Sequence, residues 1–258
     1  MDATRKEQEP AATDSLDRQR WAATAAFGLV LVGVTLLASA AHLLVVGALA
    51  GPVLVLPVIG LICLVTGLLA KRGTRAALVT ALVVAVLVLL GNVGHLADTL
   101  GLPASPWDFI PNLAALIGLL VAIPGAAAGL RTRSTTDRLQ HRVRLGSLVA
   151  LVVGAVASLA LSLVGGEALP PDAVAVTTEA NAYAPNVVEV SAGDVLGVRN
   201  LDAYGHTFTV VDLDIDAGVA GGSTATIEVG PGTPPGRYEV TCVLHPEIMV
   251  ATLVVSGS

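Results

Sequence analysis

Five long apolar runs fill most of the first 164 residues, and they constrain the fold of this chain more than any other feature. They cover residues 22–46, 53–70, 76–96, 110–130 and 145–164. A helix of about 20 apolar residues is long enough to cross a bilayer. Only 13% of the residues are charged, whereas a soluble domain is charged at about a quarter of its positions. We therefore expect an all-α transmembrane region of about five helices over residues 22–164, preceded by a polar tail over residues 1–21.

The basic residues of this region predict its orientation in the membrane. Positively charged connections stay in the cytoplasm. The tail and the connections after the second and fourth runs are basic, whereas the connection over residues 97–109 has no Lys or Arg and carries Asp98 and Asp108. The basic residues are Arg5, Lys6, Arg18, Arg20, Lys71, Arg72, Arg75, Arg131, Arg133, Arg138, Arg142 and Arg144. We therefore expect the N-terminal tail in the cytoplasm and, after five crossings of the cell membrane, an extracytoplasmic C-terminal domain.

An alternative for the first run is a cleaved signal peptide, because Ala38-Ser39-Ala40 resembles a small-residue cleavage site. The polar tail in front of the run and the apolar residues beyond the site favour a membrane helix. With either interpretation the C-terminal domain lies outside the cytoplasm.

The pattern changes after residue 164. Residues 165–172 form a predicted linker, and beyond it come short runs of alternating or β-branched residues separated by turn residues. The predicted strands cover residues 174–178, 187–190, 195–199, 207–211, 224–229, 237–242 and 250–255. Short strands at this spacing are typical of a β-sandwich. We expect an all-β Greek-key sandwich over residues 173–258.

Acidic side chains dominate this C-terminal domain. From Asp172 onward, eleven Asp or Glu residues stand against only Arg199 and Arg237. Phosphate binding requires the opposite sign, so the composition excludes nucleic acid as a partner. An acidic surface attracts a basic partner protein, but it also serves solubility alone, and the sequence leaves both explanations open.

Scarce residue types gather in the stretch CVLHPEIM, residues 242–249. The chain has two cysteines, two methionines and five histidines, and this stretch holds Cys242, His245 and Met249. A further imidazole, His206, stands just before a predicted strand, whose start can meet the end of the Cys242 strand at one pole of a sandwich. One thiolate, two imidazoles and a weak thioether are the ligands of a blue-copper site. The alternative is a buried apolar thiol beside surface histidines, but the gathering of scarce types favours copper.

The segment over residues 174–255 resembles a cupredoxin, the plastocyanin and amicyanin type of β-sandwich. The matching stretches are Tyr183-Ala184-Pro185, Ala192-Gly193-Asp194, Asn200-Leu201-Asp202 and Gly236-Arg237-Tyr238, together with His206, Cys242, His245 and Met249. The resemblance implies that these last four residues hold one type 1 copper ion, and that Asn200 ties the ligand loops together. The spacing from His245 to Met249 lies between those of the short and long ligand loops of the family, which leaves the reduction potential open.

The resemblance implies one-electron transfer between Cu(II) and Cu(I), with His245 as the edge at which electrons enter or leave. The sequence contains no recognisable nucleophile, general base or open hydrolytic metal position, so we expect an electron carrier that serves a redox partner protein, not an enzyme. One alternative is a protein that captures, delivers or senses copper, with the helices as transporter or sensor. Another is an interaction module whose copper site is vestigial.

Two histidines fall near the predicted outer ends of membrane helices. His42 and His95 are expected at similar depth on the side that carries the C-terminal domain. Ionisable residues in membrane segments often mark functional sites, which raises the hypothesis of a haem, copper or quinol site between them. The simpler interpretation is that each is an interfacial histidine near a helix end.

Overall fold

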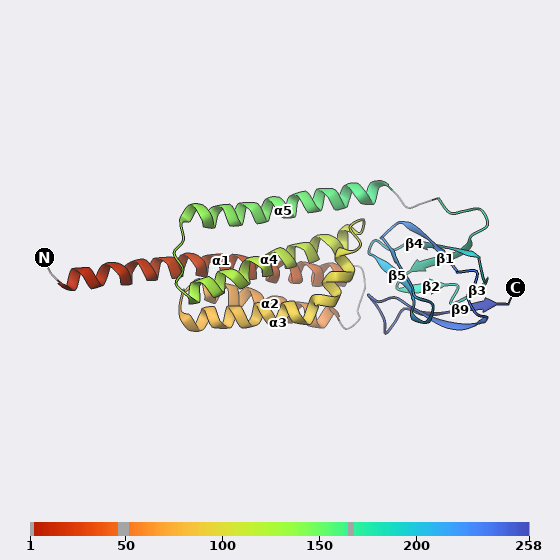
Figure 1. The fold of residues 1–258 in the computed structure, drawn as a ribbon, viewed down its shortest axis with the longest axis horizontal. Coiled ribbons are helices and arrows are strands. Elements are labelled where there is room, and N and C mark those ends of the chain that lie inside the picture. The colour runs from red at the N-terminus through yellow and green to blue at the C-terminus, as the bar shows by residue number, and fades with distance from the viewer. Residues whose placement is uncertain (1–2, 46–51, 165–167, 258) are drawn as a thin grey trace. The chain divides into compact units, whose positions relative to one another are not determined.

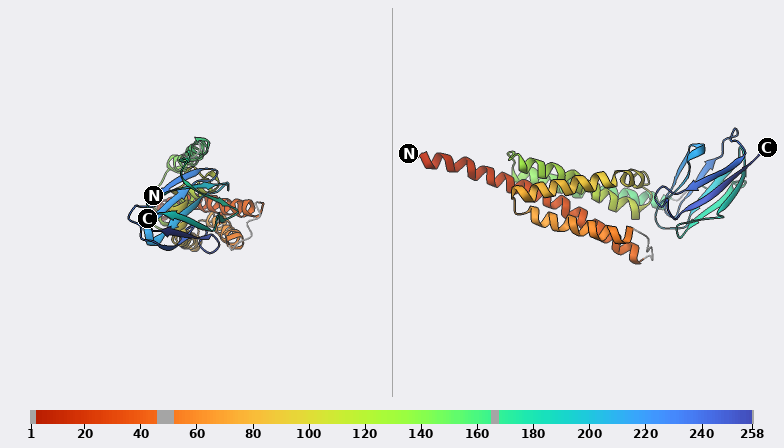
Figure 2. Two further views of the ribbon diagram at one scale, coloured as in Figure 1. Left: turned by 90° about the vertical axis from the view of Figure 1, so that its right-hand side faces the viewer. Right: turned by 90° about the horizontal axis from the view of Figure 1, so that it is seen from below.

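The chain divides into two compact units in the computed structural model, which describes residues 3–45, 52–164 and 168–257. The first unit comprises residues 1–94 and 111–153, and the second comprises residues 95–110 and 154–258. Figure 1 traces five helices followed by a β domain, and Figure 2 gives two further views of the ribbon. This order of elements confirms the predicted fold class, a helical region followed by an all-β domain.

All five predicted helices are present. They are α1 (Ala3–Val45), α2 (Pro52–Ala70), α3 (Arg75–Leu100), α4 (Pro106–Leu130) and α5 (Asp137–Val164). By length and composition, four of the described helices could cross a membrane: residues Thr13–Leu44 of α1, and α3, α4 and α5. The apolar part of α2, Leu54–Ala70, is shorter. The predicted polar tail is itself helical from Ala3, because its Lys, Glu, Gln and Ala residues are good helix formers.

Small residues allow the helices of the first unit to approach closely. A Cβ atom on Gly118 of α4 would lie 2.7 Å from the carbonyl oxygen of Gly28 of α1. A Cβ atom on Gly33 of α1 would lie 2.7 Å from the backbone nitrogen of Leu64 of α2. Such glycine contacts are typical of helices that pack in lipid, where close backbone approach provides the van der Waals contact.

Polar contacts join α1 to the connection between α4 and α5. The Arg20 guanidinium donates to both carboxylate oxygens of Asp137, at 2.8 and 3.1 Å. The Trp21 indole N–H donates to the Arg133 carbonyl at 2.8 Å, and the Thr135 backbone N–H donates to Asp17 Oδ1 at 3.3 Å. The polar start of α1 and this basic connection therefore lie at the same end of the helical unit.

The β domain consists of two mixed sheets. The first has the order β2-β1-β4-β7 and the second the order β3-β9-β8-β5-β6. Each sheet contains one parallel pair, β1 with β4 and β3 with β9. The strands are β1 (Val174–Glu179), β2 (Ala182–Ala184), β3 (Val187–Ser191), β4 (Val195–Asn200), β5 (His206–Val210), β6 (Ile215–Val219), β7 (Thr224–Glu228), β8 (Gly236–Thr241) and β9 (Val250–Ser256).

All seven predicted strands are present, and each of their ends lies within one residue of its prediction. The sequence missed β2 and β6. The strand β2 has only three residues, two of them alanine, and β6 contains Asp216 and Gly218. Alanine, aspartate and glycine are depleted in strands, so neither segment carries a strand pattern. Of the predicted linker, residues 168–172 lie outside helices and strands, and residues 165–167 lie outside the described part of the chain.

One apolar core holds the two sheets together. Phe208 of β5 is fully buried in it, and its ring meets that of Tyr183 edge to face with centroids 5.7 Å apart. Val198 and Leu253 are also fully buried, and the side chains of Cys242 and Met249 belong to the same cluster. Two of the predicted copper ligands are therefore part of the packed core, which fixes their positions.

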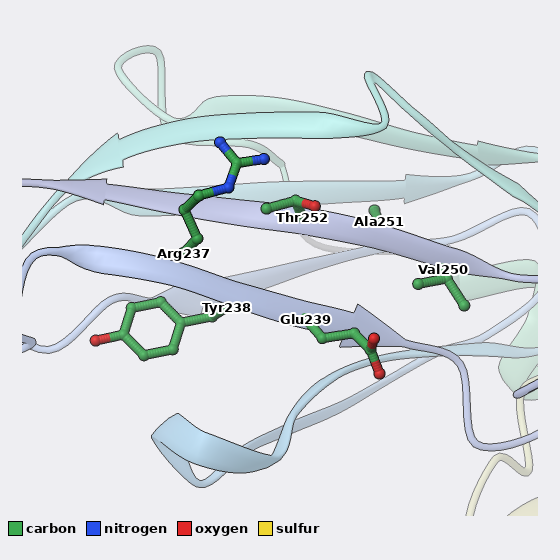
Figure 3. Close-up of a pocket in the computed structure, with 6 residues that line it drawn as sticks. All are labelled: Arg237, Tyr238, Glu239, Val250, Ala251 and Thr252. Carbon is green, nitrogen blue, oxygen red and sulfur yellow. The ribbon is translucent and has the colours of Figure 1, made fainter.

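A pocket of about 220 Å³ lies over β8 and β9 (Figure 3). Its lining contains neither His nor Cys, so it is not the predicted metal site. The residues that line it are Arg237, Tyr238, Glu239, Val250, Ala251 and Thr252.

Candidate metal centre

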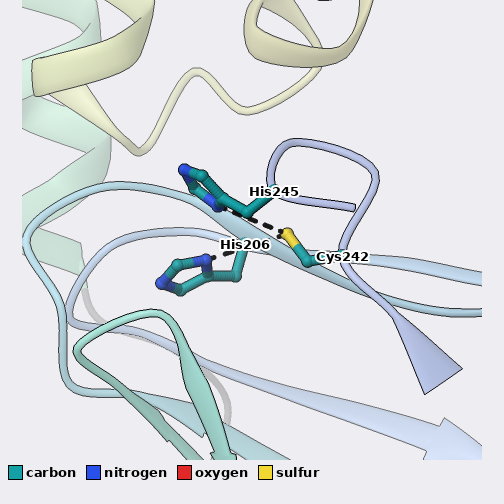
Figure 4. A group of neighbouring side chains, drawn as sticks. All are labelled: His206, Cys242 and His245. Atoms are coloured by element: carbon teal, nitrogen blue, oxygen red, sulfur yellow. Dashed lines mark hydrogen bonds between the residues drawn. The ribbon is translucent and has the colours of Figure 1, made fainter. Parts of the chain in front are cut away.

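Three of the four predicted ligands come together in the β domain (Figure 4). His206 is the first residue of β5, Cys242 follows the last residue of β8, and His245 lies in the turn after it. The Cys242 sulfur lies 3.8 Å from His206 Nδ1 and 3.7 Å from His245 Nδ1. The strands β5 and β8 are antiparallel and pair through Thr209 and Thr241, so the start of one meets the end of the other. This confirms the predicted meeting of the two strand ends.

The turn between β8 and β9 brings Met249 beside Cys242. The Cys242 N–H donates to the Met249 carbonyl at 3.1 Å, and the Met249 N–H donates to the His245 carbonyl at 3.0 Å. The His245 N–H donates to the Cys242 carbonyl at 3.0 Å, which closes the turn. Met249 is fully buried. Backbone hydrogen bonds of this turn therefore hold Cys242, His245 and Met249 close together.

The spacing of the donor atoms fits a single metal ion. A nitrogen at about 2.0 Å and a sulfur at about 2.3 Å from one ion, about 120° apart, lie about 3.7 Å from each other. The two observed sulfur–nitrogen distances are 3.7 and 3.8 Å. All three donor atoms lie within 4.8 Å of one another. Met249 follows on the same turn as Cys242 and His245 and supplies a thioether, so His206, Cys242, His245 and Met249 form a candidate type 1 copper site.

Asp202 orients the His206 ring. The Asp202 Oδ2 atom lies 2.8 Å from His206 Nε2, on the side of the ring away from the Cys242 sulfur. Asp202 is itself held by the Ala180 backbone N–H, which donates to its Oδ1 at 3.0 Å. A carboxylate that accepts from one ring nitrogen leaves the other nitrogen's lone pair free for a metal. Asp202 belongs to a stretch that resembles the family, but no sequence pattern predicts its pairing with His206.

Burial disfavours the protonated form of both imidazoles. It lowers the pKa of His206, although Asp202 opposes the shift. Burial, followed by the charges of His206 and His95, lowers the pKa of His245 to about 4. A metal binds the neutral imidazole, so these environments remove the competing proton at neutral pH.

The backbone of Thr207 forms a hydrogen bond with the Cys242 thiol. Cys242 is fully buried, and its sulfur accepts a hydrogen bond from the Thr207 backbone N–H at 3.3 Å. The Thr207 hydroxyl accepts from the Val243 N–H at 2.9 Å, which ties β5 to the residue after the cysteine. Hydrogen bonds to the cysteine sulfur tune the potential of blue-copper sites. The sequence could not predict this contact because a backbone N–H has no residue-type signature.

Tyr204 packs against both histidine rings. Its ring meets the His206 ring edge to face at 5.2 Å and the His245 ring at 5.9 Å between centroids. The loop that carries Tyr204 is held by the buried Asn200 amide, which donates to the Tyr204 carbonyl at 2.8 Å and to the Val219 carbonyl at 3.1 Å. Asn200 therefore ties the loop before His206 to β6, which gives physical content to the predicted role of this residue.

Neither the remaining histidines nor Cys63 are members of the candidate metal cluster. Among the described residues, the cluster close enough to hold a metal consists of His206, Cys242 and His245, and it includes neither His42 nor His95. Cys63 is buried among the apolar side chains of the helical unit.

Comparison with known families classifies the β domain. Residues 148–255 match the family described as Cupredoxin-like domain. This part of the chain is a cupredoxin-like domain. It follows helices that are long and apolar enough to span a membrane. A comparison with curated proteins returns no match.

Solved structures similar to this chain include an amicyanin, a purple cupredoxin and a Cu-containing nitrite reductase. Amicyanin from Paracoccus versutus is 21% identical, with 34% of this chain and 85% of that chain covered and a TM-score of 0.30. The purple cupredoxin from Nitrosopumilus maritimus is 19% identical, with 32% of this chain and 99% of that chain covered and a TM-score of 0.27. The Cu-containing nitrite reductase from Thermus scotoductus is 24% identical, with 36% of this chain covered and a TM-score of 0.30. The match spans only 24% of that reductase chain.

Proposed function

We propose that this protein is a membrane-anchored, outward-facing type 1 copper protein that transfers single electrons at the membrane surface. The observation that carries the proposal is the approach of one thiol and two imidazoles to within 4.8 Å at the point where β5 and β8 meet. Bound copper would supply the redox chemistry by cycling between Cu(II) and Cu(I). His206, Cys242, His245 and Met249 are the proposed ligands.

The surroundings of these residues favour electron transfer over chemistry on a substrate. Cys242, His206 and Met249 are fully buried, and Asp202, Thr207 and Asn200 hold the segments that carry them. A framework that is fixed in this way changes little when the charge of the site changes. Electron transfer benefits from this rigidity, because little structural rearrangement accompanies the change of charge.

The proposed route for electrons is the half-buried His245, on the turn after β8. Exposed apolar side chains flank it on the same turn: Val243 is 39% exposed and Ile248 is 53% exposed. Apolar groups in the centre of a contact and charges around it are typical of transient protein partners. The acidic surface of the domain would attract a partner of basic character.

The charge pattern supports the proposed orientation in the cell membrane. The contacts of Arg20 with Asp137 and of Trp21 with Arg133 join two basic segments that the charge rule assigns to the cytoplasm. Four crossings separate these segments in the proposed topology, so both lie on the same side. The fifth crossing then carries the cupredoxin-like domain outside.

The test is to purify the full chain in detergent, add Cu(II), and record the visible spectrum before and after ascorbate and ferricyanide. We expect an intense thiolate-to-copper band that disappears on reduction and returns on oxidation. Cys242→Ser should abolish the band. Cys63→Ser is the matched control, because it removes the other cysteine of the chain and should leave the band unchanged.

Other outcomes would contradict the proposal in distinct ways. Copper that binds without the band, or only as Cu(I), would favour the capture, delivery or sensing of copper. A chain that binds no copper would favour an interaction module. A band that survives Cys242→Ser would refute the proposed ligand set.

A further inference from the structure

The connection between α3 and α4 contacts the backbone on both sides of His206. This connection, residues 95–110, belongs to the same compact unit as the β domain. The Gly205 N–H donates to Asp108 Oδ2 at 2.6 Å, and the Gly221 N–H donates to Ser105 Oγ at 2.8 Å. Gly205 directly precedes His206 in the chain. Gly221 lies two residues after Val219, the residue of β6 that pairs with His206.

Two glycines of the β domain leave room for one leucine of the connection. A Cβ atom on Gly218 would lie 2.5 Å from Leu102 Cδ2, and a Cβ atom on Gly205 would lie 2.7 Å from Leu102 Cδ1. Both distances are shorter than side-chain packing permits. Neither glycine has a positive φ, so the backbone conformation does not require glycine at either position. At both positions the neighbour is a terminal methyl group of Leu102, which would have to shift to admit a Cβ atom.

The polar groups of the contact are matched to one another. Ser105 is fully buried, and it immediately precedes α4, whose first residue is Pro106. Asp108 lies in the first turn of that helix, where a negative charge is favourable. Two side-chain acceptors on the connection therefore meet two backbone donors on the β domain. Buried backbone N–H groups require such partners, because leaving them unpaired is costly.

We propose that residues 102–108 are a built-in docking element for the loops that hold His206. Leu102 fills the space beside two glycines of the β domain. Asp108 and Ser105 accept from the backbone N–H groups of Gly205 and Gly221, on either side of His206. The His206 end of the copper site then has a partner in the chain itself, while the apolar turn with Val243 and Ile248 remains exposed for a redox partner. The docking rests on the proposed function, because it makes the geometry of the ligand His206 depend on the connection between two membrane helices. The docking itself can be tested without copper.

Hydrogen exchange of the full-length chain in lipid nanodiscs, without metal, tests the docking directly. We expect Gly218→Ala to accelerate exchange of the Gly205 and Gly221 amides by roughly tenfold or more, as expected when one hydrogen bond is lost. Adding Leu102→Ala to Gly218→Ala should restore slow exchange, because it removes the methyl groups that the new Cβ meets. The β3 and β9 amides should remain protected in all variants, which shows that the domain is folded.

Side-chain deletions on the connection give an independent test. Asp108→Ala should accelerate exchange at Gly205, and Ser105→Ala should accelerate exchange at Gly221. Asp98→Ala is the matched control, because Asp98 is an exposed aspartate near the end of α3. Unchanged exchange in Gly218→Ala, in Asp108→Ala and in Ser105→Ala would overturn the docking proposal. So would a double variant that exchanges as fast as Gly218→Ala.

The copper spectrum separates this proposal from the proposed function. If copper binds to the wild-type chain, Gly218→Ala should shift the thiolate-to-copper band and the double variant should restore it. A chain that binds no copper but shows the predicted exchange pattern would retain the docking and refute the copper site. Normal copper binding with no change in exchange would refute the docking alone.

Discussion

At the scale of single residues, the pairing of Asp202 with His206 decides which imidazole nitrogen is free. The carboxylate accepts from Nε2 at 2.8 Å, and Nδ1 faces the Cys242 sulfur. Loss of such a supporting carboxylate typically costs about 10- to 100-fold in metal affinity. We expect Asp202→Asn to weaken copper binding to the full chain by this factor, measured by competition with a chelator of known affinity.

A control variant distinguishes the loss of the Asp202–His206 contact from the loss of one negative charge. Asp212 is an exposed aspartate, so Asp212→Asn makes the same change in net charge at a surface position. Asp212→Asn should bind copper as the wild-type chain does. Equal affinities for Asp202→Asn and the wild-type chain would show that Asp202 has no orienting role.

A substitution at Met249 can test metal binding with little effect on core packing. Met249 is fully buried in the core of the β domain, and leucine has a similar volume. An exchange of this kind usually costs less than about 1.5 kcal/mol of stability. We expect Met249→Leu to fold normally and bind copper, but with a higher reduction potential, because Cu(II) loses a donor that stabilises its greater charge.

Protein-film voltammetry measures this change for Met249→Leu. Each tenfold loss in the relative stability of the Cu(II) form raises the potential by about 59 mV. A potential equal to that of the wild-type chain would show that the thioether does not contact the metal.

The sequence predicted the ligands but not the groups that support them. His206, Cys242, His245 and Met249 belong to scarce residue types, so their gathering was visible without a structure. Asp202 is one of eleven acidic residues in the domain, and its partner is set by the course of an irregular loop. The same holds for Tyr204, whose contacts with both imidazoles depend on how two loops fold against each other.

At the scale of secondary-structure elements, Asn200 joins three strands at the end of β4. Its amide donates to the Val219 carbonyl of β6 at 3.1 Å and to the Tyr204 carbonyl at 2.8 Å, and its oxygen accepts from the Thr178 hydroxyl of β1 at 3.1 Å. Each buried hydrogen bond contributes about 1 kcal/mol, and the carbonyls left unpaired add to the cost. We expect Asn200→Ala to lower the free energy of unfolding of the β domain by roughly 3 kcal/mol.

Urea-dependent hydrogen exchange of β1 and β4 in the full chain measures the effect of Asn200→Ala. Asn186→Ala provides the comparison, because Asn186 is exposed and its backbone carbonyl, which accepts from the Thr252 N–H at 2.9 Å, is kept in the variant. A loss of stability in Asn200→Ala no larger than that in Asn186→Ala would contradict the bridging role.

The elements that the sequence predicted are those with a strong pattern of their own. Seven strands have alternating or β-branched residues between turn signals. The edge strands β2 and β6 form without such a pattern, because β2 pairs with β1 and β6 pairs with β5 once the sheets assemble. The polar start of α1 was predicted as a tail because hydropathy shows which residues can enter lipid, not where a helix begins.

At the scale of the whole molecule, charge and helix count make the same prediction about orientation. Basic residues occupy alternate connections, and the number of proposed crossings is odd. The shortest proposed span is α2, whose apolar part, Leu54–Ala70, is below the length of the other four. The orientation depends on this helix, since a chain that crosses only four times would return the cupredoxin-like domain to the side of the N-terminus.

Single cysteines placed on the two sides distinguish these topologies. In a chain with Cys63→Ser and Cys242→Ser, we expect a membrane-impermeant maleimide added to intact cells to label Gly257→Cys but not Ser134→Cys. Both positions are exposed, and Ser134 lies in the basic connection between α4 and α5. Both should be labelled once the membrane is permeabilised, which controls for reactivity. If neither is labelled in intact cells, α5 does not cross, because it is the one helix between the two positions. If Ser134→Cys alone is labelled, the cupredoxin-like domain faces the cytoplasm, as expected when α2 does not cross or when the charge rule assigns the wrong side.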